Sequence, residues 1–136
     1  MRVVFDTNIF VSAFVIPGSR AEEAIQRIVE GPDVLILSKA IIRELLATLS
    51  RKFSRDGEEL AHVAVFLAEI SELCQPTRKV RVLKDDPDNR VLECALAGHA
   101  DAVVTGDRAM LSLRQYKGIE ILSLKDYLAR IVNESS

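Results

Sequence analysis

The sequence has no tryptophan, and only two of its 136 residues are cysteines. Cys74 and Cys94 stand apart and form no CxxC motif, so they suggest no disulfide framework and fit a reducing compartment, with the cytoplasm as the expected location. No apolar run approaches the ~20 residues of a membrane-spanning helix. Asp6 follows the start too early for the apolar core of a signal peptide. These absences favour a globular protein with no membrane contact.

Aromatic residues and net charge are also low. Aromatic side chains make up 5% of the chain, and the formal net charge is −2. A base-stacking platform is therefore not expected, and composition alone does not indicate a nucleic-acid-binding protein. The sequence is 49% hydrophobic and 28% charged, without repeats or linkers, which is ordinary for one globular domain. We expect a single domain over residues 1–132 and a short frayed tail at 133–136.

Short apolar runs alternate with segments of helical periodicity. The expected strands cover residues 3–5, 34–37, 80–83, 102–105 and 119–122. The expected helices cover residues 19–30, 38–49, 58–73, 89–97, 108–113 and 123–132. Because the strands are continuously apolar, they favour a parallel sheet with both faces covered. The sequence predicts an α/β fold, a three-layer α/β/α sandwich around a five-stranded parallel sheet.

Acidic residues follow several of these strands. Asp6 comes directly after the first strand, and Asp107 follows the fourth across one glycine, Gly106. Ligands of such folds bind beyond the carboxyl ends of the strands, where the strand order reverses. If the order is 3-2-1-4-5, Asp6 and Asp107 face each other at that point. The remaining acids in comparable positions are Asp85, Asp86 and Asp88 after the third strand and Glu44 in the helix after the second.

Each acid also has an ordinary structural interpretation. Asp88 and Asp107 can cap the helices that follow, and Asp6 can end its strand in an Asx turn. Glu44 and Glu93 can be solvated charges on helix surfaces. Taken together, however, these acids would repel one another at one sheet edge, and a divalent cation reverses that cost. Carboxylates without a set of Cys and His ligands suit Mg²⁺ or Mn²⁺ better than zinc.

Other chemistries find less support. The sequence lacks the GxxxxGKS/T and GxGxxG phosphate-binding loops and the GxSxG nucleophile motif. His62 and His99 have the sequence context of structural residues. Asn8 breaks the D-x-D motif of a haloacid-dehalogenase-type phosphatase. Asp85 and Lys125 leave a phosphoaccepting receiver domain open, although that domain needs paired acids after its first strand.

Four motifs in order resemble those of PIN-domain ribonucleases. They are Val4-Phe5-Asp6-Thr7-Asn8, Glu44 in the helix after the second strand, Asp85-Asp86-Pro87-Asp88-Asn89 with Leu92-Glu93-Cys94-Ala95, and Val103-Val104-Thr105-Gly106-Asp107. The likeness runs from Met1 to about the last helix. It implies the 3-2-1-4-5 sheet and a metal-dependent ribonuclease. Many small members are toxins of toxin–antitoxin pairs, and many form homodimers.

The resemblance also implies roles for individual residues. By position, Asp6, Glu44, Asp88 and Asp107 are the catalytic acids, which bind one or two Mg²⁺ or Mn²⁺ ions. The matching supporting positions are Asn8, Thr105, Asp85 and Glu93. The bound metal would polarise the scissile phosphate and lower the pKa of the attacking water. The sequence offers no other obvious general base.

Setting aside the four acids leaves a small excess of positive charge. The expected RNA-binding side chains lie beside the acidic motifs: Arg43, Lys84 and Arg108. Further basic candidates are Arg51, Lys52 and Arg55. We expect single-stranded or looped RNA to be bound through its backbone.

Two questions stay open at this point. The helix at 58–73 is apolar nearly all round, so it is either buried in the monomer or part of a dimer interface. The alternative function is a catalytically silent PIN-fold module that binds RNA or protein.

Overall fold

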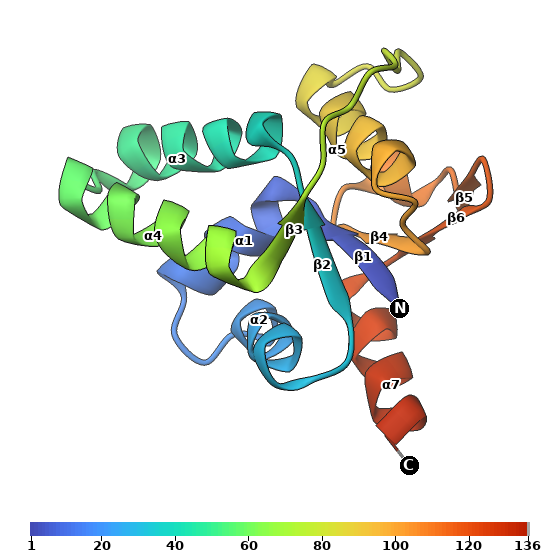
Figure 1. Ribbon diagram of the computed structural model, residues 1–136, viewed down its shortest axis with the longest axis horizontal. Helices are drawn as coiled ribbons and strands as arrows, with labels where there is room; N and C mark the ends of the chain where they lie inside the picture. The colour runs from blue at the N-terminus through green and yellow to red at the C-terminus, as the bar shows by residue number, and fades with distance from the viewer. Residues whose placement is uncertain (136) are drawn as a thin grey trace.

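The computed structural model describes residues 1–135, with side chains described as far as residue 130 (Figure 1). Strands and helices alternate along most of the chain. In order they are β1 (Arg2–Phe5), α1 (Thr7–Val15), α2 (Arg20–Glu30), β2 (Val34–Leu37), α3 (Lys39–Phe53), α4 (Gly57–Ile70), β3 (Ser71–Leu73), α5 (Asp86–Ala97), β4 (Ala102–Val104), α6 (Arg108–Leu111), β5 (Gln115–Tyr116), β6 (Ile119–Leu122) and α7 (Leu124–Ser135). Within these described residues, no helix is both long and apolar enough to cross a membrane.

The described strands form one sheet with the order β3-β2-β1-β4-β6-β5. All neighbours are parallel except β5, which pairs antiparallel with β6. With β6 as the fifth parallel strand, the predicted order 3-2-1-4-5 is confirmed. The prediction of five strands missed β5, which a hairpin turn adds at the edge. Lys117 and Gly118 both have positive φ in that turn, the backbone geometry of a tight hairpin.

The third strand lies at β3, and the expectation of a strand at residues 80–83 is wrong. β3 pairs with β2 in the register Leu35 to Ser71, so α4 ends earlier than the expected helix at 58–73. Residues 80–83 belong to the loop between β3 and α5. The apolar segment that contains Val80 resembles a buried strand in sequence, and Val80 is indeed only 3% exposed. Its backbone, however, binds side chains of α5 rather than a neighbouring strand.

Helix α1 was not expected from the sequence. Asp6 has an extended backbone and stands at the N-cap position, and the helix begins directly at Thr7. Its residues include Ile9, Phe10 and Ala13, which are buried. Aromatic and β-branched residues have modest helix propensity, so packing against the sheet rather than local preference forms this helix.

Helices cover both faces of the sheet, which confirms the three-layer α/β/α prediction. Helix α5 contacts β1, β2 and β4. Phe5 packs against Phe10 of α1 and Tyr127 of α7, with ring centroids 5.8 and 5.5 Å apart. Figure 1 shows α3 and α4 side by side as a pair that extends from the sheet.

Two expectations concern helices near the edges of this core. Leu67 is the fully buried residue of α4, while Val65 is 56% exposed, so the monomer covers α4 on one side. The expected frayed tail at 133–136 lies in the segment whose side chains are outside the described part of the structure. The backbone of α7 continues to Ser135.

Candidate active site

Asp6 and Asp107 lie at the carboxyl ends of two adjacent parallel strands. Asp6 follows β1, Asp107 follows β4, and the register aligns Phe5 with Val104. The buried Thr105 hydroxyl donates to Asp6 Oδ2 over 2.7 Å and accepts from the backbone N–H of Asp107 over 3.0 Å. One hydroxyl therefore connects both predicted acids.

Asp107 also has the capping role that the sequence allowed. Its Oδ1 accepts from the backbone N–H of Met110 over 2.9 Å at the start of α6. The second oxygen of the carboxylate takes no part in this cap. Capping by Oδ1 therefore leaves the other oxygen of the carboxylate free of the cap, so the capping role does not exclude a role in the acidic cluster.

Asp88 is placed beside these acids by the first turn of α5. The N-cap of α5 is Asp85 rather than Asp88. Asp88 is only 6% exposed, and its buried Oδ2 has no hydrogen-bond partner among the described residues. Burial, followed by the negative charges of Asp6 and Asp107, raises the pKa of Asp88 to about 7. A buried carboxylate with these neighbours requires either a proton or a cation.

The pKa of Asp6 is also raised, for similar reasons. Its side chain is 3% exposed. Burial, with a further contribution from Asp107, raises its pKa above the ordinary value. The hydrogen bond from Thr105 opposes this rise because it stabilises the ionised form.

Glu44 lies on α3, half-buried at a small cavity of about 120 Å³. The cavity is also lined by Thr7, Asp86 and Arg90, among others. Thr7 follows Asp6 in the chain, and Asp86 belongs to the same turn of α5 as Asp88. Glu44 therefore faces the same cavity as residues that neighbour Asp6 and Asp88 in the chain.

The other predicted supporting residues fall into two groups. Asn8 and Asp85 are exposed at the starts of α1 and α5. Glu93 is buried, as is Asn89, which was not among the predicted supporting residues, and both bind the loop before α5. Asn89 exchanges two hydrogen bonds with the backbone of Leu83, at 2.9 and 2.8 Å.

Glu93 joins the loop to a residue that the sequence analysis missed. Its Oε2 accepts from the backbone N–H of Val80 over 2.9 Å and from Arg90 over 2.6 Å. Arg90 also reaches Asp86 at 3.1 Å. The spacing of Arg90 four residues after Asp86 and three before Glu93 was the available signal. These bonds position the turn that contains Asp88.

The carboxylates of this site are chemically suited to a divalent cation, although their arrangement does not by itself form a complete set of metal ligands. Among the described residues, no three His, Cys, Asp or Glu side chains gather closely enough to hold a metal ion. The negative charges of Asp6 and Asp107 nevertheless contribute to the raised pKa of Asp88, and that of Asp107 to the raised pKa of Asp6. The buried Asp88 Oδ2 and the all-oxygen donors fit a hard cation such as Mg²⁺ or Mn²⁺.

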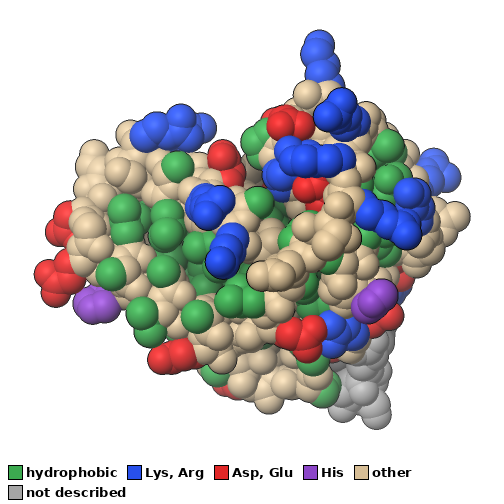
Figure 2. Space-filling view, turned by 45° about the horizontal axis from the view of Figure 1, so that its top comes forward, with side chains coloured by type: hydrophobic (Ala, Val, Ile, Leu, Met, Phe, Trp, Pro, Cys, Tyr) green, Lys and Arg blue, Asp and Glu red, His purple; other side chains and the backbone are tan. Residues whose placement is uncertain are grey.

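Basic side chains surround this edge of the molecule. The predicted RNA-binding residues Arg43, Lys84 and Arg108 are all exposed. Figure 2 shows Lys and Arg side chains gathered over the loop before α5, with acidic side chains among them. Three exposed members of that loop were not predicted as RNA-binding residues, because part of the segment resembles a strand in sequence: Arg78, Lys79 and Arg81.

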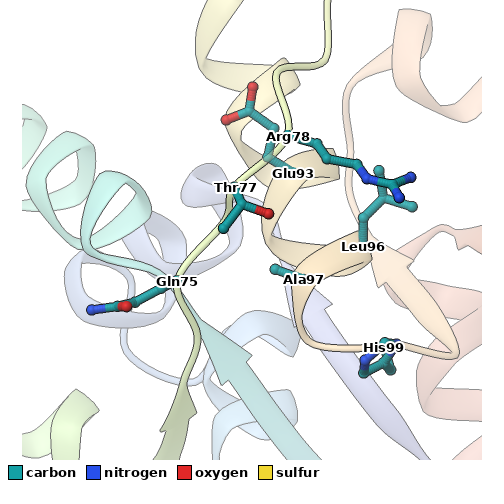
Figure 3. Close-up of a pocket in the computed structure, with 7 residues that line it drawn as sticks. All are labelled: Gln75, Thr77, Arg78, Glu93, Leu96, Ala97 and His99. Carbon is teal, nitrogen blue, oxygen red and sulfur yellow. The ribbon is translucent and has the colours of Figure 1, made fainter.

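A larger pocket lies elsewhere. It has a volume of about 360 Å³ and is lined by Gln75, Thr77, Arg78, Glu93, Leu96, Ala97 and His99. Figure 3 shows it between the loop and the second half of α5. The four predicted acids are not among its lining residues, so its size does not make it the candidate site.

The family follows from comparison with known proteins. The sequence pattern of the PIN domain family matches residues 2–109, which include all four predicted acids. The chain belongs to the PIN domain family.

The chain also resembles individual proteins. The uncharacterized protein MJ1680 of Methanocaldococcus jannaschii is 27% identical over 132 residues, covering 92% of this chain and 84% of that protein. Two solved structures share the fold. VapBC2 of Rickettsia felis, bound to a DNA fragment from its promoter, superposes with a TM-score of 0.68 at 15% identity, covering 90% of this chain and 98% of that one. VapBC-1 of nontypeable Haemophilus influenzae gives 0.65 at 16% identity, covering 92% and 99%.

Proposed function

We propose that the protein is a metal-dependent ribonuclease whose catalytic acids are Asp6, Glu44, Asp88 and Asp107. The observation that carries the proposal is the buried Oδ2 of Asp88 beside two other aspartates at the switch point of the sheet. Burying the carboxylates of Asp6 and Asp88 beside the half-buried Asp107 destabilises the metal-free fold, and structural needs alone do not explain it. A bound cation does explain it.

The proposed cofactor is Mg²⁺ or Mn²⁺, as one or two ions. Asp6, Asp88 and Asp107 would hold it, and Glu44 would bind it or orient a water from the adjoining cavity. When bound, the ion would polarise the scissile phosphate and lower the pKa of the attacking water. Thr105 positions Asp6 through its hydroxyl. The loop bonds of Asn89 and Glu93 position Asp88.

The proposed substrate is single-stranded or looped RNA. Arg43, Lys84 and Arg108 are exposed around the acids and can contact backbone phosphates. The loop residues Arg78, Lys79 and Arg81 extend this basic surface. Low aromatic content supports recognition of the backbone rather than stacked bases. Cleavage should therefore weaken steeply as salt concentration rises.

The proposed biological role is the toxin of a toxin–antitoxin pair in the cytoplasm. The fold likeness to two VapBC structures supports an antitoxin partner. Expression of the wild type should then arrest growth of the host cell, while Asp6→Asn should not. The apolar side of α4, which includes exposed Val65, supports a homodimer. Light scattering at micromolar concentration tests the dimer, and a 15.1 kDa monomer would reject it.

One observation favours a second candidate, a catalytically silent module that binds RNA or protein. In the part of the chain with described side chains, the acids form no ready-made group of three metal ligands. A silent module would bind RNA without cleaving it, and divalent cations would leave its melting temperature unchanged.

Cleavage of an end-labelled mixed RNA distinguishes these functions. Wild type, Asp6→Asn and the charge-matched surface control Glu69→Gln are incubated with Mg²⁺, Mn²⁺ or EDTA. The proposal predicts metal-dependent cleavage by wild type and Glu69→Gln, and none by Asp6→Asn, with all three proteins folded by circular dichroism. Cleavage by Asp6→Asn at the wild-type rate would reject the assigned site.

A further inference from the structure

The two cysteines, twenty residues apart in sequence, meet in the fold. Cys74 directly follows β3, and Cys94 lies in α5. Their Sγ atoms are 3.4 Å apart, and the Cys74 thiol also lies 3.6 Å from the carbonyl oxygen of Cys94. Both residues are free thiols. The thiols therefore face each other between the loop and the helix that contains Asp88.

The backbone holds both cysteines in place. The N–H of Cys74 donates to the carbonyl of Leu37 at the end of β2 over 2.9 Å. Cys94 is fully buried within α5, and its carbonyl accepts from Gly98 over 2.9 Å. Because each residue is anchored to a regular element, the short distance between the sulfurs is a property of the fold rather than of a loop conformation.

Solvent reaches one thiol but not the other. Cys74 is half-buried and lines a cavity of about 350 Å³ between the loop and the start of α3. Lys39 also lines this cavity. A small oxidant can therefore reach Cys74 first, because Cys94 is fully buried and does not line the cavity.

The thiols also differ in acidity. The hydrogen bond with Cys94 lowers the pKa of the Cys74 thiol, and burial partly opposes this effect. The same hydrogen bond, followed by burial, raises the pKa of Cys94. The thiolate is the nucleophile in thiol oxidation, so this difference agrees with Cys74 as the thiol that reacts first.

We propose that Cys74 and Cys94 are a redox-active pair that closes to an intramolecular disulfide when the protein meets a peroxide. The Cys74 thiolate attacks one peroxide oxygen, which forms a sulfenic acid and releases the other oxygen as hydroxide. The sulfur of Cys94 then attacks the Cys74 sulfur and expels the second hydroxide. The two thiol protons convert both hydroxides to water, so one peroxide oxidises two thiols.

The disulfide would join the end of β3 to the middle of α5. The covalent ring would enclose residues 75–93, which are the segment between β3 and α5 and the first part of α5. Closing a loop of this length restricts the unfolded chain, so the oxidised protein should melt at a temperature higher by about 5 °C or more. A dithiol reductant should reverse the change. The disulfide would thus restrain the loop before α5 and the first turn of α5, which contains Asp88. This restraint does not depend on whether the site holds a metal.

The test is treatment of the full-length protein with a small excess of hydrogen peroxide, followed by intact mass measurement and non-reducing peptide mapping. The expected result is a monomer lighter by two hydrogen atoms, with a Cys74–Cys94 cross-link that dithiothreitol removes. Cys74→Ser should retain a reduced Cys94 that resists alkylation until the protein unfolds. Cys94→Ala should progress to sulfinic acid at Cys74. A cross-link between two chains, a wild-type sulfinic acid with free Cys94, or a lower melting temperature after oxidation would each overturn the proposal.

Discussion

The Thr105 hydroxyl donates a 2.7 Å hydrogen bond to Asp6 Oδ2, although ninety-nine residues separate them in sequence. Both side chains are buried, at 0% and 3% exposure. The hydroxyl accepts from the N–H of Asp107 at the same time. Thr105 therefore sets the position of one acid and the backbone of another, at the junction of β1 and β4.

Thr105→Val removes this hydroxyl with little change in shape. The change leaves a buried carboxylate oxygen and the Asp107 N–H without their partner, which should cost about 1–3 kcal/mol of unfolding free energy. The pKa of Asp6 should rise further, because the hydrogen bond holds it down. Urea unfolding and metal-dependent cleavage measure the two effects. Thr105→Ser restores the donor, so equal losses in both variants would contradict the role of the hydroxyl.

Asp88→Asn should change stability in a pH-dependent manner. The pKa of Asp88 is raised to about 7 in the folded protein without metal, against about 4 in an unfolded chain. The folded state therefore binds this proton more tightly, so its stabilising contribution is complete below about pH 4 and is lost as the pH rises to about 7. Above that pH the ionised group destabilises the fold by up to about 4 kcal/mol.

The variant should accordingly melt at a higher temperature than wild type at pH 8 in EDTA, and at nearly the same temperature at pH 4.5. Thermal melts followed by circular dichroism measure both. Glu69→Gln on the exposed surface of α4 is the matched control and should lack this pH-dependent gain. An Asp88→Asn protein that is less stable than wild type at both pH values would contradict the claim that the ionised Asp88 carboxylate destabilises the metal-free fold.

Glu93→Ala and Asp86→Ala remove the two partners of Arg90 and should differ in effect. Glu93 is buried and binds both Arg90 and the loop N–H of Val80, so its loss should cost about 2–4 kcal/mol. Asp86 is exposed, and its ion pair should contribute about 0.5 kcal/mol or less. Hydrogen exchange should show faster exchange of the loop amides in Glu93→Ala alone. Similar exchange in both variants would contradict the anchoring role.

Gly98→Ala tests the packing of α5 on the sheet. A Cβ at Gly98 would meet Ile36 Cγ2 of β2 at 2.5 Å, a clash within the core. The expected cost is about 1–3 kcal/mol in urea unfolding. When Gly98→Ala is combined with Ile36→Ala, which removes the clashing methyl group, the double variant should lose less stability than the sum of the two single losses. Strict additivity would show that the contact does not limit the approach of α5.

The sequence predicted much of the fold because its main strands are short apolar runs with acids at their ends. Asp6 and Asp107 could be paired from strand order alone. The true third strand could not be predicted, since Ser71, Glu72 and Leu73 lie on an exposed edge and carry little apolar signal. Val80 carries that signal but packs in a loop held by Glu93.

Other parts of the site depend on contacts between distant residues. The proximity of Cys74 to Cys94 arises from β3 and α5 packing together, which their spacing does not indicate. In sequence Arg90 resembles any other helix charge, and only the folded α5 shows that it binds both Glu93 and Asp86. Glu44 could be assigned to a helix after β2, but its cavity next to Thr7 depends on how α1, α3 and α5 meet.

Titration with Mn²⁺, followed by electron paramagnetic resonance of the free ion, tests the central claim most directly. Wild type and the surface control Glu69→Gln should bind one or two ions with equal affinity, and Asp88→Asn should lose at least about tenfold in affinity at pH 7.5. The folded state of each protein is checked by circular dichroism. Equal Mn²⁺ affinity of Asp88→Asn and wild type, or no binding by wild type, would contradict a metal centre at this edge of the sheet.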